Sequence, residues 1–97
     1  MIQSFADAGT EDIFNGRSSK AARKVLPLDL HGIARRKLDW MNSAQALQDL
    51  RSPPGNRLEA LKGDRSGQHS IRVNDQYRIC FNWTPNGPEL VEIVDYH

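Results

Sequence analysis

The sequence predicts an α+β protein in which two to three helices pack on a twisted, mainly antiparallel sheet of about five strands. In the first half, apolar residues recur at spacings of three and four between Leu26 and Met41, which is the pattern of a helix with one buried face. In the second half, four β-rich segments alternate with short turns, which make neighbouring strands antiparallel. Ninety-seven residues allow one hydrophobic core, so residues 1–97 are predicted to form a single domain.

The N-terminal segment predicts a short strand followed by a short helix. Residues 2–5 form the predicted strand, with Ile2 and Phe5 as its core anchors. The stretch GTEDIFNG predicts a helix of one or two turns that is N-capped by Thr10 and ended by Gly16. The following NGRSSK is rich in turn-forming residues and is predicted to be a connector.

A longer helix is predicted from about Leu26, with Pro27 in its first turn, where proline is tolerated. Its apolar face consists of Leu26, Leu30, Ile33, Ala34, Leu38 and Met41. A second helix, or a kinked continuation, is predicted over NSAQALQDL with Ser43 as its cap. Its buried positions are Ala44, Leu47 and Leu50. The two prolines and the glycine of RSPPGN end it.

The second half of the chain predicts four strands, over RLEALKG, GQHSIRVN, QYRICFNW and ELVEIVDYH. Tight turns are predicted around Asn74–Asp75 and Asn86–Gly87. Successive side chains of a strand point to opposite faces. The face toward the helices is therefore expected to carry His69, Ile71, Val73, Tyr77, Ile79, Phe81 and Trp83.

The opposite face of the sheet is predicted to present Arg72 and Arg78 side by side on adjacent strands. Like charges in this position repel each other, so the pair needs an anion between them. Asp95 is one candidate for that anion. A phosphate group is the other, because guanidinium groups match phosphate oxygens with two parallel hydrogen bonds.

Charge is distributed in blocks along the chain although the net charge is only +1. Residues 13–37 carry seven Lys/Arg against one acid, and residues 51–78 carry six against three. These basic blocks fit either an anionic partner or solvated faces. The low net charge argues against a protein that binds free nucleic acid strongly.

Several classes of protein are excluded by composition. No apolar run is long enough to span a membrane, and the N-terminus lacks the features of a signal peptide. Cys80 is the only cysteine, and no Cys/His cluster has zinc spacing. We therefore expect a cytoplasmic protein that uses no metal and no cofactor.

The residues best suited to catalysis are the C-terminal Asp95, Tyr96 and His97, together with four cations in the second half. The cations are Lys62, Arg65, Arg72 and Arg78. Cleavage of RNA by its own 2′-hydroxyl needs a base, an acid and cations that stabilise the phosphorane. Histidine, with an ordinary pKa of about 6.5, suits either proton transfer. The alternative is that the tail only packs at the edge of the sheet.

The sequence resembles the HigB branch of the RelE-like toxins, the plasmid-maintenance killer proteins, including the GraT variant. The resemblance is carried by residues 61–83 (LKGDRSGQHSIRVNDQYRICFNW) and 87–97 (GPELVEIVDYH), with support from MIQSF and LRSPPGNRLEAL. It implies a compact RelE-like fold and a metal-independent mRNA endonuclease of the ribosomal A site that forms a 2′,3′-cyclic phosphate. It also implies a HigA-type helix-turn-helix antitoxin as partner, with operator DNA bound only through the toxin–antitoxin complex.

The same resemblance implies roles for individual residues. The terminal DYH matches the catalytic tail of the family, so Asp95, Tyr96 and His97 are expected to be catalytic, and Arg78 matches its phosphate-binding arginine. Where some HigB proteins carry an active-site histidine, this chain has Glu59, a candidate general base. RNA contacts are expected at Lys62, Arg65, Arg72 and, for ribosomal RNA, at Arg23, Lys24, Arg35, Arg36 and Lys37.

Two other functions fit the sequence. One is a catalytically silent relative that binds the antitoxin and tunes repression of the operon. The other is a small regulator that binds DNA or RNA alone, and this regulator would show a steep dependence of affinity on salt. Neither alternative predicts that removing the DYH side chains abolishes toxicity.

Overall fold

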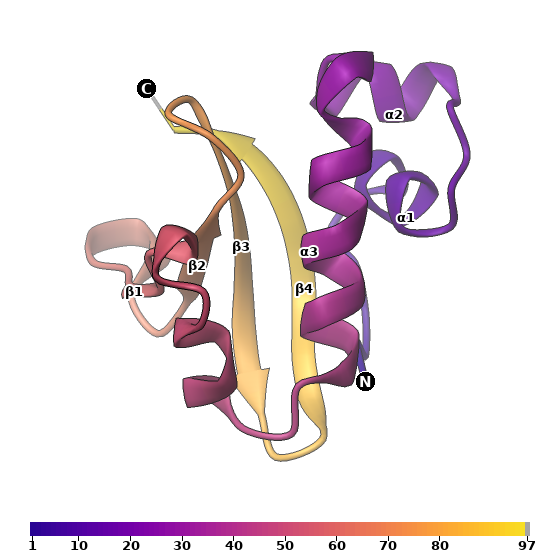
Figure 1. Ribbon diagram of the computed structural model, residues 1–97. Helices are drawn as coiled ribbons and strands as arrows, with labels where there is room; N and C mark the ends of the chain where they lie inside the picture. Colours follow the sequence, from indigo (N-terminus) through magenta and orange to yellow (C-terminus); the bar gives the residue numbers. More distant parts are fainter. Residues whose placement is uncertain (97) are drawn as a thin grey trace.

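The computed structural model describes residues 1–96, and the ribbon in Figure 1 shows all three α-helices to one side of a curved sheet. The α-helices are α1 (Ala8–Phe14), α2 (Lys20–Val25) and α3 (His31–Ser43). The strands are β1 (Glu59–Ala60), β2 (His69–Arg72), β3 (Tyr77–Thr84) and β4 (Gly87–Asp95). Short 3-10 helices occupy Leu28–Leu30, Leu47–Arg51, Pro54–Asn56 and Gly63–Arg65. The predicted α+β class is confirmed.

The sheet is a four-stranded antiparallel meander in the order β1-β2-β3-β4. The turn at Asn74–Asp75 is confirmed, and the Asn74 side chain accepts hydrogen bonds from the amides of Gln76 and Tyr77. The last turn has Pro85–Asn86 at its centre, one residue earlier than predicted, because Gly87 already pairs with Thr84.

The predicted N-terminal strand is reduced to a single parallel bridge between Phe5 and Val91. Backbone hydrogen bonds nevertheless attach this segment to the outer edge of β4, from Gln3 to Pro88, between Ser4 and Val91, and from Ala6 to Val91. The pairing does not extend into a strand at this point because β4 is irregular here. Leu90 takes a left-handed conformation with φ of 53°, and the β3–β4 register shifts between Cys80 and Asn82.

The predictions for the first two helices were partly wrong. Asp7, not Thr10, caps α1, since its Oδ1 accepts a hydrogen bond of 2.6 Å from the Thr10 amide. Thr10 instead lies within α1, where it is fully buried. The predicted connector contains the first residue of α2, which is capped by Ser19 through a 3.0 Å hydrogen bond from the Ala22 amide.

The long helix is confirmed in α3, with Ala34, Leu38 and Met41 buried, but it begins at His31 rather than near Leu26. Leu26 ends α2, and a 3-10 turn follows Pro27. The predicted second helix is a 3-10 helix of five residues, and Ser43 does not cap it, because its hydroxyl donates to the Asp39 carbonyl within α3. The strand predicted over RLEALKG shortens to the two residues of β1.

The hydrophobic core lies between the helices and one face of the sheet, as the alternation predicted. Ile71, Ile79 and Phe81 are fully buried on that face, while Tyr77 and Trp83 pack partly buried at its margin. The opposite face carries the polar side chains and is not covered by the α-helices (Figure 1). Across residues 1–96, no helix has the length and apolarity needed to cross a bilayer.

Candidate active site

The cross-strand register aligns polar residues in rows on the uncovered face of the sheet. Ser70 lies opposite both Glu59 and Cys80, and Cys80 lies opposite Glu92, so one row crosses all four strands. A second row begins with Arg72 opposite Arg78, as predicted. Because side chains of paired residues share a face, Glu59 and Arg78 lie on the same side of the sheet.

Arg78 is nearly buried on this face, with only 8% of its surface exposed. Its Nε donates to the Ser70 hydroxyl at 2.7 Å, and its Nη2 donates to the Arg57 carbonyl at 2.6 Å. These acceptors are neutral, and within residues 1–96 no carboxylate forms an ion pair with Arg78. Among residues 1–96 the guanidinium is therefore held in place without a carboxylate to balance its charge, which favours an anionic ligand.

Tyr96 covers this guanidinium. The Arg78 Cζ lies 5.5 Å from the centre of the Tyr96 ring, in the geometry of a cation–π contact. The amide of Tyr96 donates to the Gln76 carbonyl at 2.7 Å, which extends the strand geometry one residue beyond β4. The side chain is 46% exposed, so one part of the phenol holds Arg78 and another is open to a ligand.

An open cleft of about 430 Å³ lies beside this pair, lined by Glu59, Ala60, Leu61, Lys62 and Tyr96. It brings together three of the residues predicted to act on RNA, from β1, from the loop after β1 and from the end of β4. Glu59 and Lys62 are exposed, so a ligand entering the cleft would meet a carboxylate, an ammonium and a phenol.

The anion between the two arginines is not Asp95. Arg72 forms its ion pair with Asp75 in the adjacent turn. Asp95 lies opposite Tyr77, on the helix side of the sheet, and accepts a 3.0 Å hydrogen bond from the Gln76 amide group. Of the two candidate anions, Asp95 is therefore excluded, because Val94 rather than Asp95 pairs with Arg78, so the Asp95 side chain lies on the other face.

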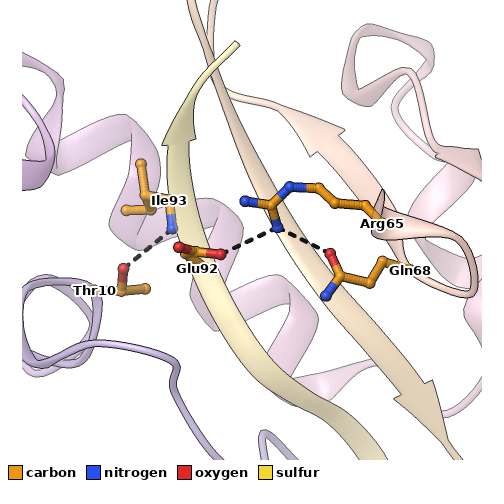
Figure 2. Close-up of polar contacts among 5 residues, drawn as sticks. All are labelled: Thr10, Arg65, Gln68, Glu92 and Ile93. Carbon is orange, nitrogen blue, oxygen red and sulfur yellow. Dashed lines mark hydrogen bonds and ion pairs between the residues drawn. The ribbon is translucent and has the colours of Figure 1, made fainter. Parts of the chain in front are cut away.

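Arg65 does not extend freely from its loop. Its Nη1 donates to the Glu92 carboxylate at 3.1 Å and to the Gln68 side chain at 3.0 Å (Figure 2). The thiol of Cys80 is fully buried close to this pair and to Arg78. Burial raises the pKa of Cys80 and Glu92 raises it further, while Arg65 and Arg78 lower it.

The cations predicted to contact ribosomal RNA divide into two groups. Arg23, Lys24, Arg35 and Arg36 are exposed on α2 and α3. Lys37 turns inward, and its Nζ donates to the buried Asn56 side chain at 2.7 Å. Burial, and then the charge of Arg72, lower the pKa of Lys37.

Four further observations concern this part of the molecule. His97, the preferred proton-transfer group of the sequence prediction, lies outside the described residues. His69 lies at the edge of the core as expected, stacked on Phe81 with 6.2 Å between ring centres. Glu92 was not predicted as a site residue. Within residues 1–96, no group of His, Cys, Asp and Glu could hold a metal ion.

Residues 3–97 match the family described as the RelE-like toxin of the type II toxin–antitoxin system HigB. The chain belongs to the HigB family. A curated relative, Toxin HigB-1 of Vibrio cholerae, is 45% identical over 97 residues, which cover all of this chain and 98% of the relative. An uncharacterized protein of Haemophilus influenzae is 41% identical over 61 residues, 63% of this chain and 60% of that protein.

The match fixes the biological setting of the chain. As a HigB-like toxin, the protein is the toxin component of a type II toxin–antitoxin system and has a cognate antitoxin as partner. The three α-helices and the four-stranded antiparallel sheet agree with the RelE-like fold.

Proposed function

We propose that this HigB-like toxin is a ribosome-dependent endoribonuclease that cleaves mRNA in the ribosomal A site without a metal ion. The observation that carries the proposal is Arg78, a nearly buried guanidinium held by neutral acceptors beside an open cleft. A scissile phosphate at this position would supply the negative charge that the described residues do not place against Arg78.

The reaction is an attack by the RNA's own 2′-hydroxyl on the adjacent phosphorus. The P–O2′ bond forms and the P–O5′ bond breaks, which leaves a 2′,3′-cyclic phosphate on one fragment and a 5′-hydroxyl on the other. A base removes the 2′ proton and an acid supplies a proton to the leaving 5′-oxygen. Arg78 and Arg72 stabilise the charge that accumulates on the phosphorane.

The proton transfers are assigned to the groups around the cleft. Glu59 and Tyr96 face it, and His97 follows directly on Tyr96. We assign His97 as the general acid or base, Tyr96 as its partner or as a stacking platform for a base, and Glu59 as the alternative general base. Asp95 orients the tail, and Lys62 binds the RNA backbone.

The partners follow from the same proposal. The antitoxin is of the HigA helix-turn-helix type and connects the toxin to operator DNA, and the toxin acts in the cytoplasm on translating ribosomes. The low net charge of +1 supports a requirement for the ribosome, because the ribosome rather than the toxin holds the mRNA.

The proposal is tested in a purified translation system programmed with one defined mRNA, by mapping new 5′ ends with and without ribosomes. We expect cuts that require ribosomes and that disappear with His97→Ala. Arg78→Lys keeps the charge but loses the guanidinium fork, so the cutting rate should fall about 10- to 100-fold. Arg51→Lys, at an exposed arginine outside the cleft, is the matched control and should cut normally.

Two outcomes would contradict the proposal. Cuts of unchanged rate in Arg78→Lys would remove the phosphate-binding role of Arg78. Complete absence of cuts, with the antitoxin still bound tightly, would make the protein the silent member of a toxin–antitoxin pair whose role is to tune operon repression.

A further inference from the structure

We infer that Arg65 and Glu92 form a bridge that fixes the two walls of the cleft relative to each other, and that Arg65 is a positioning residue rather than an RNA contact. The inference rests on the proposed nuclease function for its kinetic part. The bridge itself is a property of the fold that can be measured without any cleavage.

The bridge connects segments that are distant in sequence. Arg65 ends the 3-10 helix Gly63–Arg65 in the loop between β1 and β2. Glu92 lies on β4, the strand at the opposite edge of the sheet from β1. The Arg65 side chain extends from this loop toward β4, where its Nη1 lies 3.1 Å from the Glu92 carboxylate (Figure 2). The two side chains are only 36% and 34% exposed, so water screens them incompletely.

Beneath the Arg65–Glu92 pair the sheet carries small side chains, which the close approach of Arg65 to Glu92 requires. Ser70 and Cys80 stand between Glu59 and Glu92 in the row that crosses the sheet, and both are fully buried. The charges of Arg65 and Glu92 both shift the pKa of the Cys80 thiol, which is consistent with both groups lying close to it. Larger residues in this row would separate Arg65 from Glu92.

Arg65 is rigidly connected to one wall of the cleft. The loop is closed by backbone hydrogen bonds from Leu61 to Gln68 at 2.9 Å, from Ser66 to Gly63 at 3.0 Å and from Gln68 to Arg65 at 2.9 Å. The Arg65 side chain adds a bond to the Gln68 side chain at 3.0 Å. The Arg65 amide also donates to the Lys62 carbonyl at 3.4 Å, so a displacement of Arg65 is transmitted to Lys62, which lines the cleft.

Glu92 is connected to the opposite wall. It precedes Tyr96 by four residues, and Tyr96 directly follows β4 and continues its strand geometry. The period of two therefore places both side chains on the uncovered face. The bridge thus holds the Lys62 wall against the Tyr96 wall. It also neutralises a carboxylate that would otherwise repel the phosphates of an RNA bound to this face.

The decisive variant is Glu92→Gln, because the two roles of Arg65 predict opposite results. If Arg65 contacts RNA, removing the neighbouring carboxylate leaves cleavage unchanged or faster. If Arg65 is a positioning residue, kcat/KM falls about three- to tenfold in Glu92→Gln and by a similar factor in Arg65→Gln. The double substitution should then be no worse than either single one. The charge-reversed pair Arg65→Glu with Glu92→Arg should recover most of the loss.

Cys80 supplies a second readout that does not depend on activity, because it is the only cysteine in the chain. We measure its alkylation by iodoacetamide in the folded protein. Charge alone would lower the thiol pKa in Glu92→Gln and raise it in Arg65→Gln, so alkylation would change in opposite directions. Loss of the bridge uncovers the thiol in both variants, so we expect alkylation to accelerate in both.

The outcomes separate the bridge from the nuclease. Opposite or absent changes in alkylation, or faster cleavage by Glu92→Gln, would overturn the bridge as a positioning device. If the unsubstituted toxin cuts no RNA, the proposed function fails, while alkylation still decides whether the bridge exists. Circular dichroism of each variant confirms that the loss of activity does not come from unfolding.

Discussion

Cys80 shows how one residue of the uncovered face couples stability to pH. Its thiol is fully buried, and burial, supported by Glu92, raises its pKa above the ordinary value of 9.0. In the unfolded chain the thiol loses its proton at the ordinary pKa, whereas the folded protein retains it to higher pH. Above pH 9.0 the unfolded state therefore binds fewer protons than the folded state, and the free energy of unfolding falls as pH rises.

We predict that Cys80→Ala removes this fall. Urea unfolding from pH 7 to pH 10.5 measures the free energy of unfolding of both proteins, and the unsubstituted protein should lose more stability than the variant above pH 9.0. Below that pH the two curves should run parallel, separated only by the cost of the smaller side chain. Parallel curves over the whole range would show that the folded thiol titrates normally.

Much of the candidate site could be predicted at the level of single residues. Strand alternation and two short turns were enough to place Arg72 beside Arg78 on the uncovered face. Glu92 was missed because its partner, Arg65, lies 27 residues away in a loop, and no local pattern signals that contact. Asp95 was assigned to the wrong face because its register against β3 cannot be read from the sequence: Val94, not Asp95, pairs with Arg78.

At the level of elements, the outer edge of β4 depends on the N-terminal segment and α1. Gln3, Ser4 and Ala6 bond to the edge near Pro88 and Val91, and Thr10 continues the protection further along the strand. The Thr10 hydroxyl accepts a hydrogen bond of 3.1 Å from the Ile93 amide, which Figure 2 shows on the side of β4 away from Arg65. The edge strand is thus closed to pairing with another chain.

We predict that Thr10→Val lowers the free energy of unfolding by about 1–3 kcal/mol, because it keeps the shape of the side chain but leaves the buried Ile93 amide without its acceptor. Thr10→Ser keeps the hydroxyl and is the matched control, with a smaller loss from the missing methyl group. Thermal and urea unfolding measure both. Equal losses in the two variants would show that packing, and not the hydrogen bond, makes Thr10 important.

Sequence patterns predicted best the elements in which the apolar pattern repeats several times. The buried stripe of α3 is confirmed, and Ile79 and Phe81 of β3 are buried against the helices as predicted. Burial itself does not alternate along β3, because Arg78 and Cys80 on the other face are buried too. Helix α2 was missed because six residues are too few to show a period, although Ser19 gave a usable N-cap signal. β1 was overestimated because its exposed residues pair with β2 only at Glu59 and Ala60.

At the scale of the whole molecule, the cleft and the exposed cations of the helices lie on different parts of the surface. The cleft is built from β1, the following loop and the end of β4, whereas Arg23, Lys24, Arg35 and Arg36 project from α2 and α3. The helices cover the sheet face opposite to the one that carries Arg78 (Figure 1). Binding to the ribosome and the chemical step are therefore expected to be separable by mutation.

We predict that the double substitution Arg35→Gln and Arg36→Gln weakens binding to ribosomes without slowing the cut on saturated ribosomes. Each lost contact with a phosphate of single-stranded or loop RNA should reduce the slope of log K against log salt by about 0.7. The double variant should thus bind with a slope shallower by about 1.4 and with a higher KM, while kcat stays unchanged. Cosedimentation with ribosomes over a range of salt concentrations measures the slope.

Arg51→Gln removes an exposed arginine from a different element, the 3-10 helix Leu47–Arg51, and serves as the control for net charge. A slope shallower by about 0.7 in this single variant, half the change expected for the double variant, would mean that only the overall charge of the toxin determines its binding to the ribosome. A fall in kcat at unchanged KM in the double variant would instead connect α3 to the chemical step. The separation expected here matters physically, because a chain with a net charge of +1 can use a local group of cations to bind the ribosome while it reserves Arg78 for the scissile phosphate.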